Sequence, residues 1–413
     1  MSLPAARWPA GSTFFSSLAV PYFLPVWASG GFWALSRWFS AFLTSYLVTQ
    51  LTGSPLLVQL TSAAFFFTNL CGGLLAGVLT DRWDPRRTCI GGYVILLPFA
   101  AAMAAAVLSG HVQVWMVYPF MLAMGLGQVM STSVRVVLVH DLVGDRHMTN
   151  ALVWEYFSLT AGSIVAPIIA GAVIQFVGIG QAFTLAILSL SGGVISLLCY
   201  PASVQRGQRR APAGKTSLSQ DLRIGLALLR ENRALVSLLG VTAAMNLFFF
   251  PYVPLVPVFA QRLDVSPLLT GLLVSAAGMG TLASTAVIAS RPNPPRGWLF
   301  CAGSMLGLAA LIGLAAAPGY PLAFFSLVVA GVGVAGFGSM QSALTLSIVP
   351  SDMRGRAMGL VSVVIGLMPF GLLLLGILAQ IGGPPAGLIL AAGAGLALLL
   401  VAMAKRPDIR TVR

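Results

Sequence analysis

The 413-residue chain is too hydrophobic to be an ordinary soluble protein. Hydrophobic residues make up 58% of it, charged residues only 8%, and the mean hydropathy is +0.92, whereas soluble domains carry about 25% charged residues. The composition therefore requires a lipid bilayer. The net charge of +13 does not indicate nucleic-acid binding, because Lys and Arg are scattered singly through short connections instead of gathering on one face.

Twelve apolar segments are long enough to cross a bilayer, which takes about 20 helical residues. They are separated by charged or Gly/Pro-rich connections, and the sequence predicts an all-α polytopic membrane protein with twelve transmembrane helices. Residues 13–26, which contain Pro21 and Pro25, are predicted to extend the first helix or to lie at the interface. The predicted spans are 27–50, 55–79, 88–109, 114–137, 150–177, 180–200, 234–260, 266–289, 297–317, 321–347, 357–381 and 384–404.

Positive charge lies almost entirely on one side of the predicted membrane. Among the 23 Lys and Arg residues, only Arg37 falls well inside a predicted span, and only Arg262 falls in a connection on the other side. Cytoplasmic loops carry the excess of Lys and Arg in membrane proteins. Both termini, and every connection from an even-numbered to an odd-numbered helix, are therefore predicted to be cytoplasmic.

The second half of the chain repeats the pattern of the first. Residues 139–146 align with 349–356, and residues 81–87 align with 291–296. This spacing indicates a six-helix unit duplicated in parallel. The predicted domains are an N-terminal six-helix bundle (1–200), a basic cytoplasmic linker (201–233) and a C-terminal six-helix bundle (234–413).

Five short segments carry a resemblance to a known family. The first two lie at the ends of predicted helices 1 and 2, the third joins helices 4 and 5, the fourth lies within helix 5, and the fifth precedes helix 11. In that order they are residues 51–55, 77–87, 135–150, 162–171 and 349–359. Together they resemble the major facilitator superfamily of transporters, and most of all its bacterial efflux branch of macrolide-type and enterobactin-type exporters. The resemblance implies two helical bundles with a substrate site between them near the membrane midplane, and transport by alternating access. It also implies a multi-pass protein of the bacterial cytoplasmic (inner) membrane.

The charged loop after predicted helix 2 is the segment for which the resemblance implies a mechanical role. In the family, such a loop stabilises the outward-facing state against the start of helix 11, whose N-terminal end attracts a carboxylate. A topology signal is the alternative interpretation, and Asp84 with Pro85 departs from the family's loop pattern. The residues assigned to this conformational latch are Gly77, Asp81, Arg82, Arg86, Arg87 and Arg356.

Predicted helix 5 carries small residues around a proline. Gly162, Ala166, Pro167 and Gly171 resemble the antiporter signature of the family, with Ala166 and Ala170 in place of two glycines. Small residues let helices approach closely, and a proline lets a helix bend. The resemblance favours export, and generic small-residue packing is the alternative.

Arg37 and Glu155 are the charges placed well inside predicted helices. Each would cost about 2.5–3.5 kcal/mol if it faced lipid, so both are predicted to face the protein interior. We predict a charge site in which Glu155 carries a proton or counters a cationic substrate, and Arg37 tunes its proton affinity. A structural ion pair, or a hydrated Glu155 near the interface, is the alternative. Arg135 is predicted to pair with Asp141 or Asp145 in a structural role.

Polar and aromatic side chains on predicted helices 1, 4, 7 and 10 indicate a mostly apolar, adaptable substrate cavity. Buried amides need hydrogen-bond partners, so those on these helices are predicted either to contact substrate or to bond neighbouring helices. Such a lining favours amphipathic organic molecules over sugars or phosphates. The residues assigned to the cavity are Gln128, Asn246, Tyr252, Gln341 and Trp33.

The predicted function is secondary active export of amphipathic small organic molecules, drug-like or siderophore-like, in exchange for protons. The chain is not expected to be an enzyme or to hold a cofactor or metal, because it has no Walker-type loop and its four cysteines form no CxxC pair. The expected partners are the substrate, protons and membrane lipids, with no nucleic acid, and the protein is expected to be a monomer. An importer or uniporter on the same fold, and a non-transporting receptor or lipid-handling protein, are the alternatives.

Overall fold

The described part of the chain is built from helices and short connections, with no strand. The structure is a computed structural model, and it describes residues 16–82, 84–201, 232–291, 295–350 and 353–405. The chain divides into two compact units, one made of residues 1–43 and 67–213 and the other of residues 44–66 and 214–413. The predicted linker lies almost wholly outside the described residues, and the predicted domain boundaries stay a prediction.

The first two helices contribute residues to both units. Helix α1 (Phe23–Thr52) begins after turns at residues 16–22, so only the last residues of the uncertain segment 13–26 belong to it. Helix α2 (Pro55–Arg82) follows after a turn at Gly53. Their ends nearest this turn, residues 44–66, belong to the second unit.

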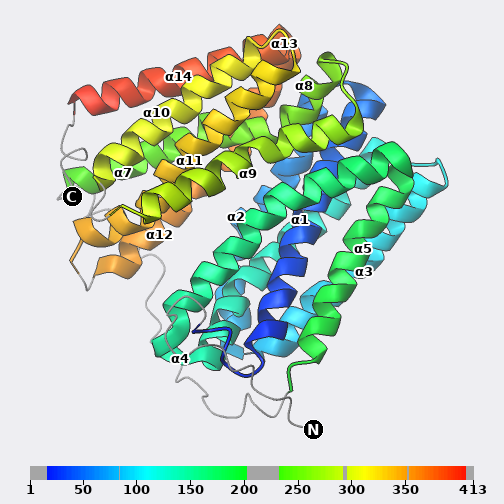
Figure 1. Ribbon diagram of the computed structural model, residues 1–413, viewed down its shortest axis with the longest axis vertical. Helices are drawn as coiled ribbons and strands as arrows, with labels where there is room; N and C mark the ends of the chain where they lie inside the picture. Colours follow the sequence, from blue (N-terminus) through cyan, green and yellow to red (C-terminus); the bar gives the residue numbers. More distant parts are fainter. Residues whose placement is uncertain (1–15, 83, 202–231, 292–294, 351–352, 406–413) are drawn as a thin grey trace. The chain divides into compact units, whose positions relative to one another are not determined.

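The first unit packs helix α3 (Pro85–Leu108) against α5 (Ile179–Leu198) and against the long helix α4 (Val114–Phe176); Figure 1 shows α3 and α5 side by side. With 63 residues, α4 would be about 95 Å long if straight. It bends at Gly144, whose φ of 66° and ψ of 175° are non-helical and suit a glycine. Residues 138–149, predicted as a connection, are therefore helical apart from this kink.

Asp84 and Pro85, the departure from the family's loop pattern, form the start of α3. The carboxylate of Asp84 accepts a hydrogen bond from the backbone N–H of Arg87 at 2.9 Å, and Pro85 occupies the first turn of the helix. An acidic N-cap followed by proline is a favourable helix start, because the carboxylate satisfies a free N–H and the ring fixes φ. The two residues thus set where α3 begins.

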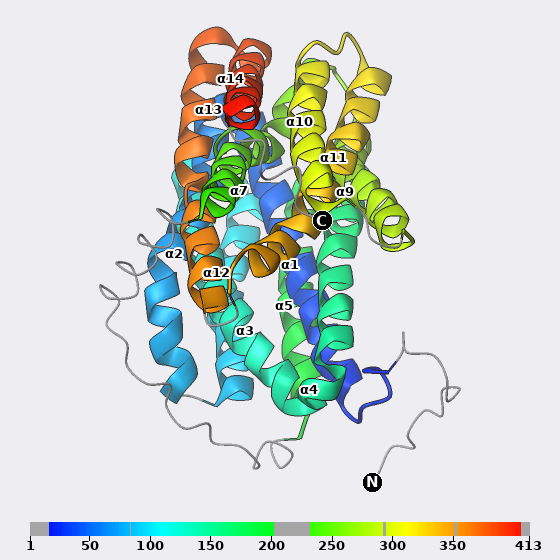
Figure 2. The ribbon, with the colours of Figure 1, turned by 90° about the vertical axis from the view of Figure 1, so that its left-hand side faces the viewer.

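The second unit contains the helices that follow residue 232, several of which are visible in Figure 2. Helix α11 packs against α9 and α10, while α14 packs against α7, α10 and α13. Their bounds are α7 (Arg233–Ala244), α8 (Val256–Arg262), α9 (Pro267–Ala289), α10 (Arg296–Ala315), α11 (Tyr320–Ile348), α12 (Arg354–Ile365), α13 (Met368–Gly382) and α14 (Pro384–Lys405). The bounds of α9, α10, α11 and α14 each fall within a few residues of a predicted span, whereas α7 and α8 share the span 234–260, and α12 and α13 share the span 357–381.

The predicted span 234–260 is interrupted. Between α7 and α8 the chain forms a π-helical turn, η3 (Met245–Phe249), and a 3₁₀ turn, η4 (Phe250–Leu255). Pro251, Pro254 and Pro257 lie in or beside this break, and each removes a backbone N–H that a regular helix would use. The span is therefore a broken helix whose backbone carbonyls are partly released.

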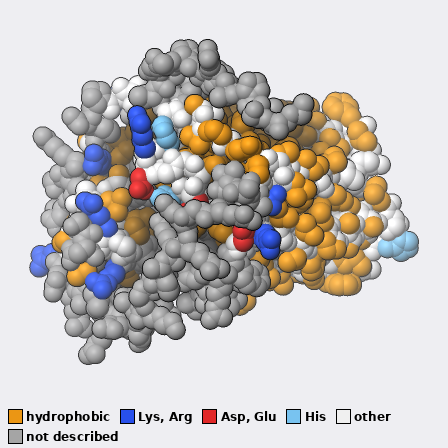
Figure 3. Space-filling view, turned by 90° about the horizontal axis from the view of Figure 1, so that it is seen from below, with side chains coloured by type: hydrophobic (Ala, Val, Ile, Leu, Met, Phe, Trp, Pro, Cys, Tyr) orange, Lys and Arg blue, Asp and Glu red, His pale blue; other side chains and the backbone are white. Residues whose placement is uncertain are grey.

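The exposed surface suits a lipid environment. Large hydrophobic side chains stay exposed in both units, among them Phe176, Ile195 and Phe325, and Figure 3 shows many such side chains on the described surface. Nine described helical runs are long and apolar enough to cross a membrane, α4 being counted once. The prediction of an all-α polytopic membrane protein is confirmed, and the number of twelve crossings stays a prediction.

Candidate functional site

A buried ion pair joins the two arms of α4. Arg135 lies before the kink at Gly144 and Glu155 after it. The Nε of Arg135 lies 2.6 Å from Oε2 of Glu155, and its Nη2 lies 2.8 Å from Oε1. The side chains are only 8% and 18% exposed. This two-point geometry between guanidinium and carboxylate is the strong form of the interaction.

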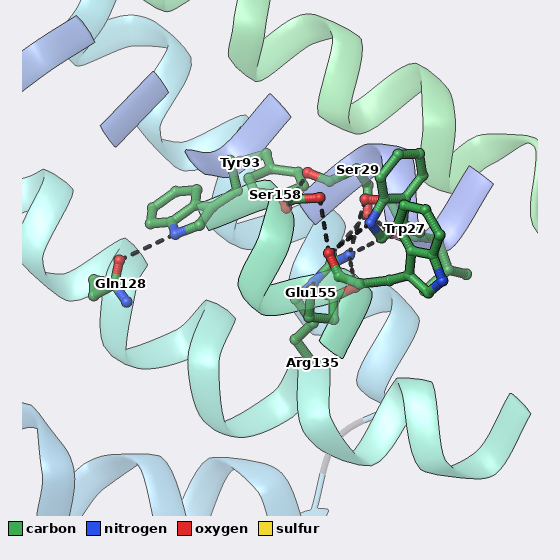
Figure 4. A network of polar contacts seen from close by, with 10 residues as sticks. Trp27, Ser29, Tyr93, Gln128, Arg135, Glu155 and Ser158 are labelled. Atoms are coloured by element: carbon green, nitrogen blue, oxygen red, sulfur yellow. Dashed lines mark hydrogen bonds and ion pairs between the residues drawn. The ribbon is translucent and has the colours of Figure 1, made fainter. Parts of the chain in front are cut away.

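The same arginine holds the beginning of α1. Its Nη1 donates to Oγ of Ser29 at 2.8 Å, and its Nη2 donates to the carbonyl of Val26. Ser29 in turn donates to the Val26 carbonyl at 2.6 Å. Figure 4 shows these contacts converging on Arg135 from α1 and from the second arm of α4. One buried cation thus connects three helical segments of the first unit, and we call this set the Arg135 cluster.

Gly30 leaves the space that the guanidinium occupies. A Cβ atom at this position would overlap the Cζ and Nη2 atoms of Arg135, whereas at the adjacent Gly31 the nearest atom is Oγ of Ser158 at 4.0 Å. The absence of a side chain at Gly30 is therefore what lets Arg135 reach the backbone of α1.

Replacing Gly30 with alanine is expected to lower the free energy of unfolding by about 1–3 kcal/mol, the usual penalty for overpacking a filled interior. Thermal unfolding in detergent measures it through Tm. Gly31→Ala is the matched control, because it adds the same methyl group one residue away in open space. Equal Tm values for the two variants would contradict the assigned role of Gly30.

Aromatic side chains surround the Arg135 cluster. The hydroxyl of Tyr93 on α3 donates to the carbonyl of Ser29 at 3.1 Å, and its ring stacks on Trp33 with centroids 5.6 Å apart. Trp33 donates through Nε1 to Oε1 of Gln128 at 3.1 Å, and Trp27 donates to the carbonyl of Trp154 at 2.9 Å. Buried aromatic groups with satisfied polar ends hold helices in a fixed arrangement.

Two predicted pairings are corrected by this geometry. Glu155 is bonded to Arg135 instead of Arg37, and Arg135 is bonded to Glu155 instead of Asp141 or Asp145. The guanidinium of Arg37 lies 5.3 Å from the ring centroid of Trp38. The predicted end of helix 4 at residue 137 made Arg135 look like a terminal residue, whereas α4 continues past it and Arg135 is buried.

The two aspartates near the kink pair with a histidine. Nε2 of His140 lies 2.8 Å from Oδ1 of Asp145, and its Nδ1 lies 3.7 Å from Oδ1 of Asp141. The Asp145 side chain is 98% exposed. An exposed pair of this kind contributes little to stability. The two aspartates therefore make local contacts with His140 at the surface.

The small residues predicted as an antiporter-type motif lie on a buried face of α4. A Cβ atom on Gly162 would lie 3.0 Å from Cβ of Ala34 on α1, which is closer than most such contacts. Ala166, Pro167 and Gly171 are buried as well. The face therefore packs tightly against neighbouring helices, as small residues in membranes do.

The residues assigned to the conformational latch are only partly described. Gly77, Asp81 and Arg82 lie in the last turns of α2, and their side chains fall outside the described residues. Arg86 donates through Nε to the carbonyl of Leu197 at 3.1 Å, at the end of α5, where a cation is favourable. Arg87 is exposed, and Arg356 donates to the sulfur of Met353 at 3.2 Å.

The predicted cavity residues of the second unit also have partners in the protein. Nδ2 of Asn246 donates to the carbonyl of Thr242 at 2.9 Å, and Nε2 of Gln341 donates to Oγ1 of Thr242 at 3.0 Å. The Tyr252 ring lies edge-on to Phe249, with centroids 5.3 Å apart. Thr242, which sequence reasoning missed, links the two amides and ties α7 to α11.

Comparisons with known proteins agree on fold and family. The profile of the Major Facilitator Superfamily matches residues 26–370. Macrolide efflux protein A from Streptococcus pyogenes is 21% identical over 368 residues, covering 87% of this chain and 89% of the relative. Macrolide efflux protein A from Enterococcus faecalis is 22% identical over 329 residues, covering 78% of this chain and 100% of the relative.

Solved structures share the fold at lower identity. A bacterial homologue of the human lysosomal transporter Spinster, in an inward-facing and unoccupied conformation, has a TM-score of 0.71 at 15% identity, with 96% of each chain covered. A POT family transporter in complex with a thioalcohol-conjugated peptide has a TM-score of 0.74 at 13% identity, covering 94% of this chain and 96% of that one.

Proposed function

Because the chain belongs to the Major Facilitator Superfamily, we propose that this multi-pass membrane transporter exports amphipathic small organic molecules of the macrolide kind in exchange for protons. The observation that carries the direction and substrate class is the match to macrolide efflux proteins of two organisms over most of each chain. The small-residue face around Pro167, which resembles the antiporter signature, supports export.

Glu155 is the proposed proton carrier, and Arg135 takes the place first assigned to Arg37. Within the spans of the first unit, the Glu155 carboxylate is only 18% exposed and makes two bonds to the guanidinium of Arg135. Protonation removes the negative charge that Arg135 binds, and leaves the guanidinium on Val26 and Ser29 of α1. Proton uptake would therefore loosen the link between the arms of α4 while the link to α1 remains.

The substrate is proposed to contact Gln128, Trp33, Asn246, Tyr252 and Gln341. The amides are already bonded within the protein, so substrate would replace or extend those bonds instead of meeting free groups. The conformational latch assigned to Asp81 and Arg356 belongs to the same proposal. The proposal also includes cytoplasmic termini and a location in the bacterial inner membrane.

Everted membrane vesicles test the proposal. With a proton gradient imposed, acid inside, vesicles that contain this protein are expected to accumulate a labelled macrolide, and an uncoupler should abolish the accumulation. Vesicles from cells without the protein are the control. An importer would instead deplete the vesicles, and accumulation that persists without the gradient would rule out proton antiport.

A further inference from the structure

Thr242 holds two amide side chains at the point where the broken span loses its regular helical form. It lies near the end of α7, and Asn246 follows it in the π-helical turn η3. Gln341 approaches from α11, within the same unit. The carbonyl of Thr242 accepts from Nδ2 of Asn246 at 2.9 Å, and its Oγ1 accepts from Nε2 of Gln341 at 3.0 Å. One threonine thus receives a hydrogen bond from each amide.

The partners of the two amides fix which way each amide points. The hydroxyl of Thr242 donates its single proton to the carbonyl of Leu238 at 2.9 Å, so toward Gln341 it can only accept. The Gln341 side chain must therefore turn its NH₂ group, and not its oxygen, to Thr242. The Asn246 side chain is fixed in the same way, because a backbone carbonyl accepts and cannot donate.

The oxygen atoms of the two amides remain as acceptors. No described residue donates to Oδ1 of Asn246 or to Oε1 of Gln341, and the described residues do not fully enclose either atom. Asn246 as a whole is only 3% exposed, so bulk water reaches it poorly. A buried amide oxygen without a donor is unfavourable, and a donor group of a bound molecule would satisfy it.

Aromatic rings flank the two amides. Phe249 and Phe250 follow Asn246 within about one turn, and Phe337 lies one turn before Gln341 on α11. The ring of Phe250 lies edge-on to Phe249 and to Phe337, with centroids 5.3 and 5.9 Å apart. Aromatic rings pack on apolar groups, and their faces attract cations. These neighbours therefore suit an amphipathic molecule whose polar group is a donor.

The two helical segments that carry the amides offer no charge to an anionic ligand. Residues 234–261, which contain most of α7 and the irregular turns, include no Lys, Arg, Asp or Glu, and neither do residues 320–348 of α11. A carboxylate or phosphate beside the amide oxygens would meet acceptors of its own kind and no counter-charge from these segments. Such a mismatch excludes a ligand as effectively as a good contact selects one.

We propose that Thr242 is a positioning residue for substrate selection. By holding both NH₂ groups, it turns the oxygens of Asn246 and Gln341 toward the substrate, and the site selects molecules that present a hydroxyl or a protonated amine. The assignment rests on the transport function proposed above and adds the polarity of the group that is recognised. It is independent of the direction of transport and of the proton.

Binding of matched ligand pairs tests this assignment. The two members of a pair differ in one donor: a macrolide against its mono-O-methylated derivatives, and an amphipathic tertiary amine against its N-methyl quaternary derivative, which keeps the charge and lacks the N–H. Equilibrium dialysis with the purified protein in detergent gives each Kd. In at least one pair, the unaltered protein is expected to bind the donor-bearing member about fivefold more tightly, the effect of roughly one hydrogen bond.

Three variants separate the role of Thr242 from a general effect on packing. Thr242→Val removes the acceptor for Gln341 at constant shape, so the amide can turn either end to the ligand and the fivefold ratio should fall toward unity. Thr242→Ser keeps the hydroxyl and should keep the ratio. Gln341→Leu leaves Thr242 in place but removes an amide oxygen, and its ratio should also fall, which provides a second measurement if Thr242→Val does not fold.

Several results would overturn the assignment. They are a ratio near unity for every pair in the unaltered protein, a preference that persists in both Thr242→Val and Gln341→Leu, a preference that is lost in Thr242→Ser, and no binding by any donor-bearing molecule. If the amine pair behaves as expected but no macrolide binds or enters everted vesicles, the role of Thr242 stands and the proposed macrolide export fails.

Discussion

Replacing Arg135 with alanine should lower the free energy of unfolding by about 3–5 kcal/mol, the cost of breaking a buried ion pair. The variant leaves the carboxylate of Glu155 without its cation, and removes the hydrogen bonds that Arg135 donates to the carbonyl of Val26 and the hydroxyl of Ser29 on α1. Reversible unfolding in mixed detergent micelles, followed by tryptophan fluorescence, measures the change.

A double-mutant cycle separates the ion pair from the attachment to α1. Glu155→Ala alone should cost less than Arg135→Ala alone, because the guanidinium keeps its bonds to α1. Adding Glu155→Ala to Arg135→Ala should recover part of the loss, since the orphaned carboxylate is gone. Arg87→Ala, at an exposed position, is the control for removing an arginine. If the effects of the two substitutions simply add, Arg135 and Glu155 are not energetically coupled. That result would contradict the role assigned to their 2.6 Å contact.

Replacing Glu155 with glutamine should abolish concentrative export while the protein still folds. Glutamine keeps the shape of the side chain and one acceptor oxygen for Arg135, but it cannot exchange a proton. The accumulation ratio of a macrolide in everted vesicles under a proton gradient is expected to fall to unity, whereas exchange down a concentration gradient should continue.

Asp145→Asn provides the matched control for this experiment. It removes a carboxylate from the same helix α4 at a position that is 98% exposed, so its export should equal that of the unaltered protein. Undiminished proton-driven export by Glu155→Gln would eliminate Glu155 as the carrier. The pair Arg135 and Glu155 would then be a structural element of the first unit.

The positions of the helices followed from the sequence because hydrophobic length decides them. A bilayer demands about 20 apolar residues per crossing, and the bounds of α3, α9 and α14 fall within three residues of the predicted spans. The kink at Gly144 was harder to predict from the sequence, because helical residues continue on both sides of it. The break in the predicted span 234–260 was missed, although Pro251, Pro254 and Pro257 lie in or beside it, because hydropathy treats that span as one helix.

The partners of the charged residues could not be predicted, because they depend on which helix faces which. Arg37 and Glu155 were matched by their depth along separate helices, and depth says nothing about rotation about the helix axis. Arg135 lies 20 positions before Glu155, on the other side of the kink, and only the fold brings them together. The pair Gly30 and Gly31 was a signal in the sequence for a close neighbour of α1. Glycines inside a helix are unfavourable unless a neighbouring group needs the space.

The broken span has a consequence for how the protein is made. Its irregular backbone cannot face lipid, because released carbonyls have no donors there, and its described neighbours include α13 and α14. Those helices are synthesised more than a hundred residues after η3 and η4. A chain that stops before Met368 would lack two of the helices that cover the break. We therefore expect premature-stop products to be degraded faster than the full chain, even when most spans have been inserted.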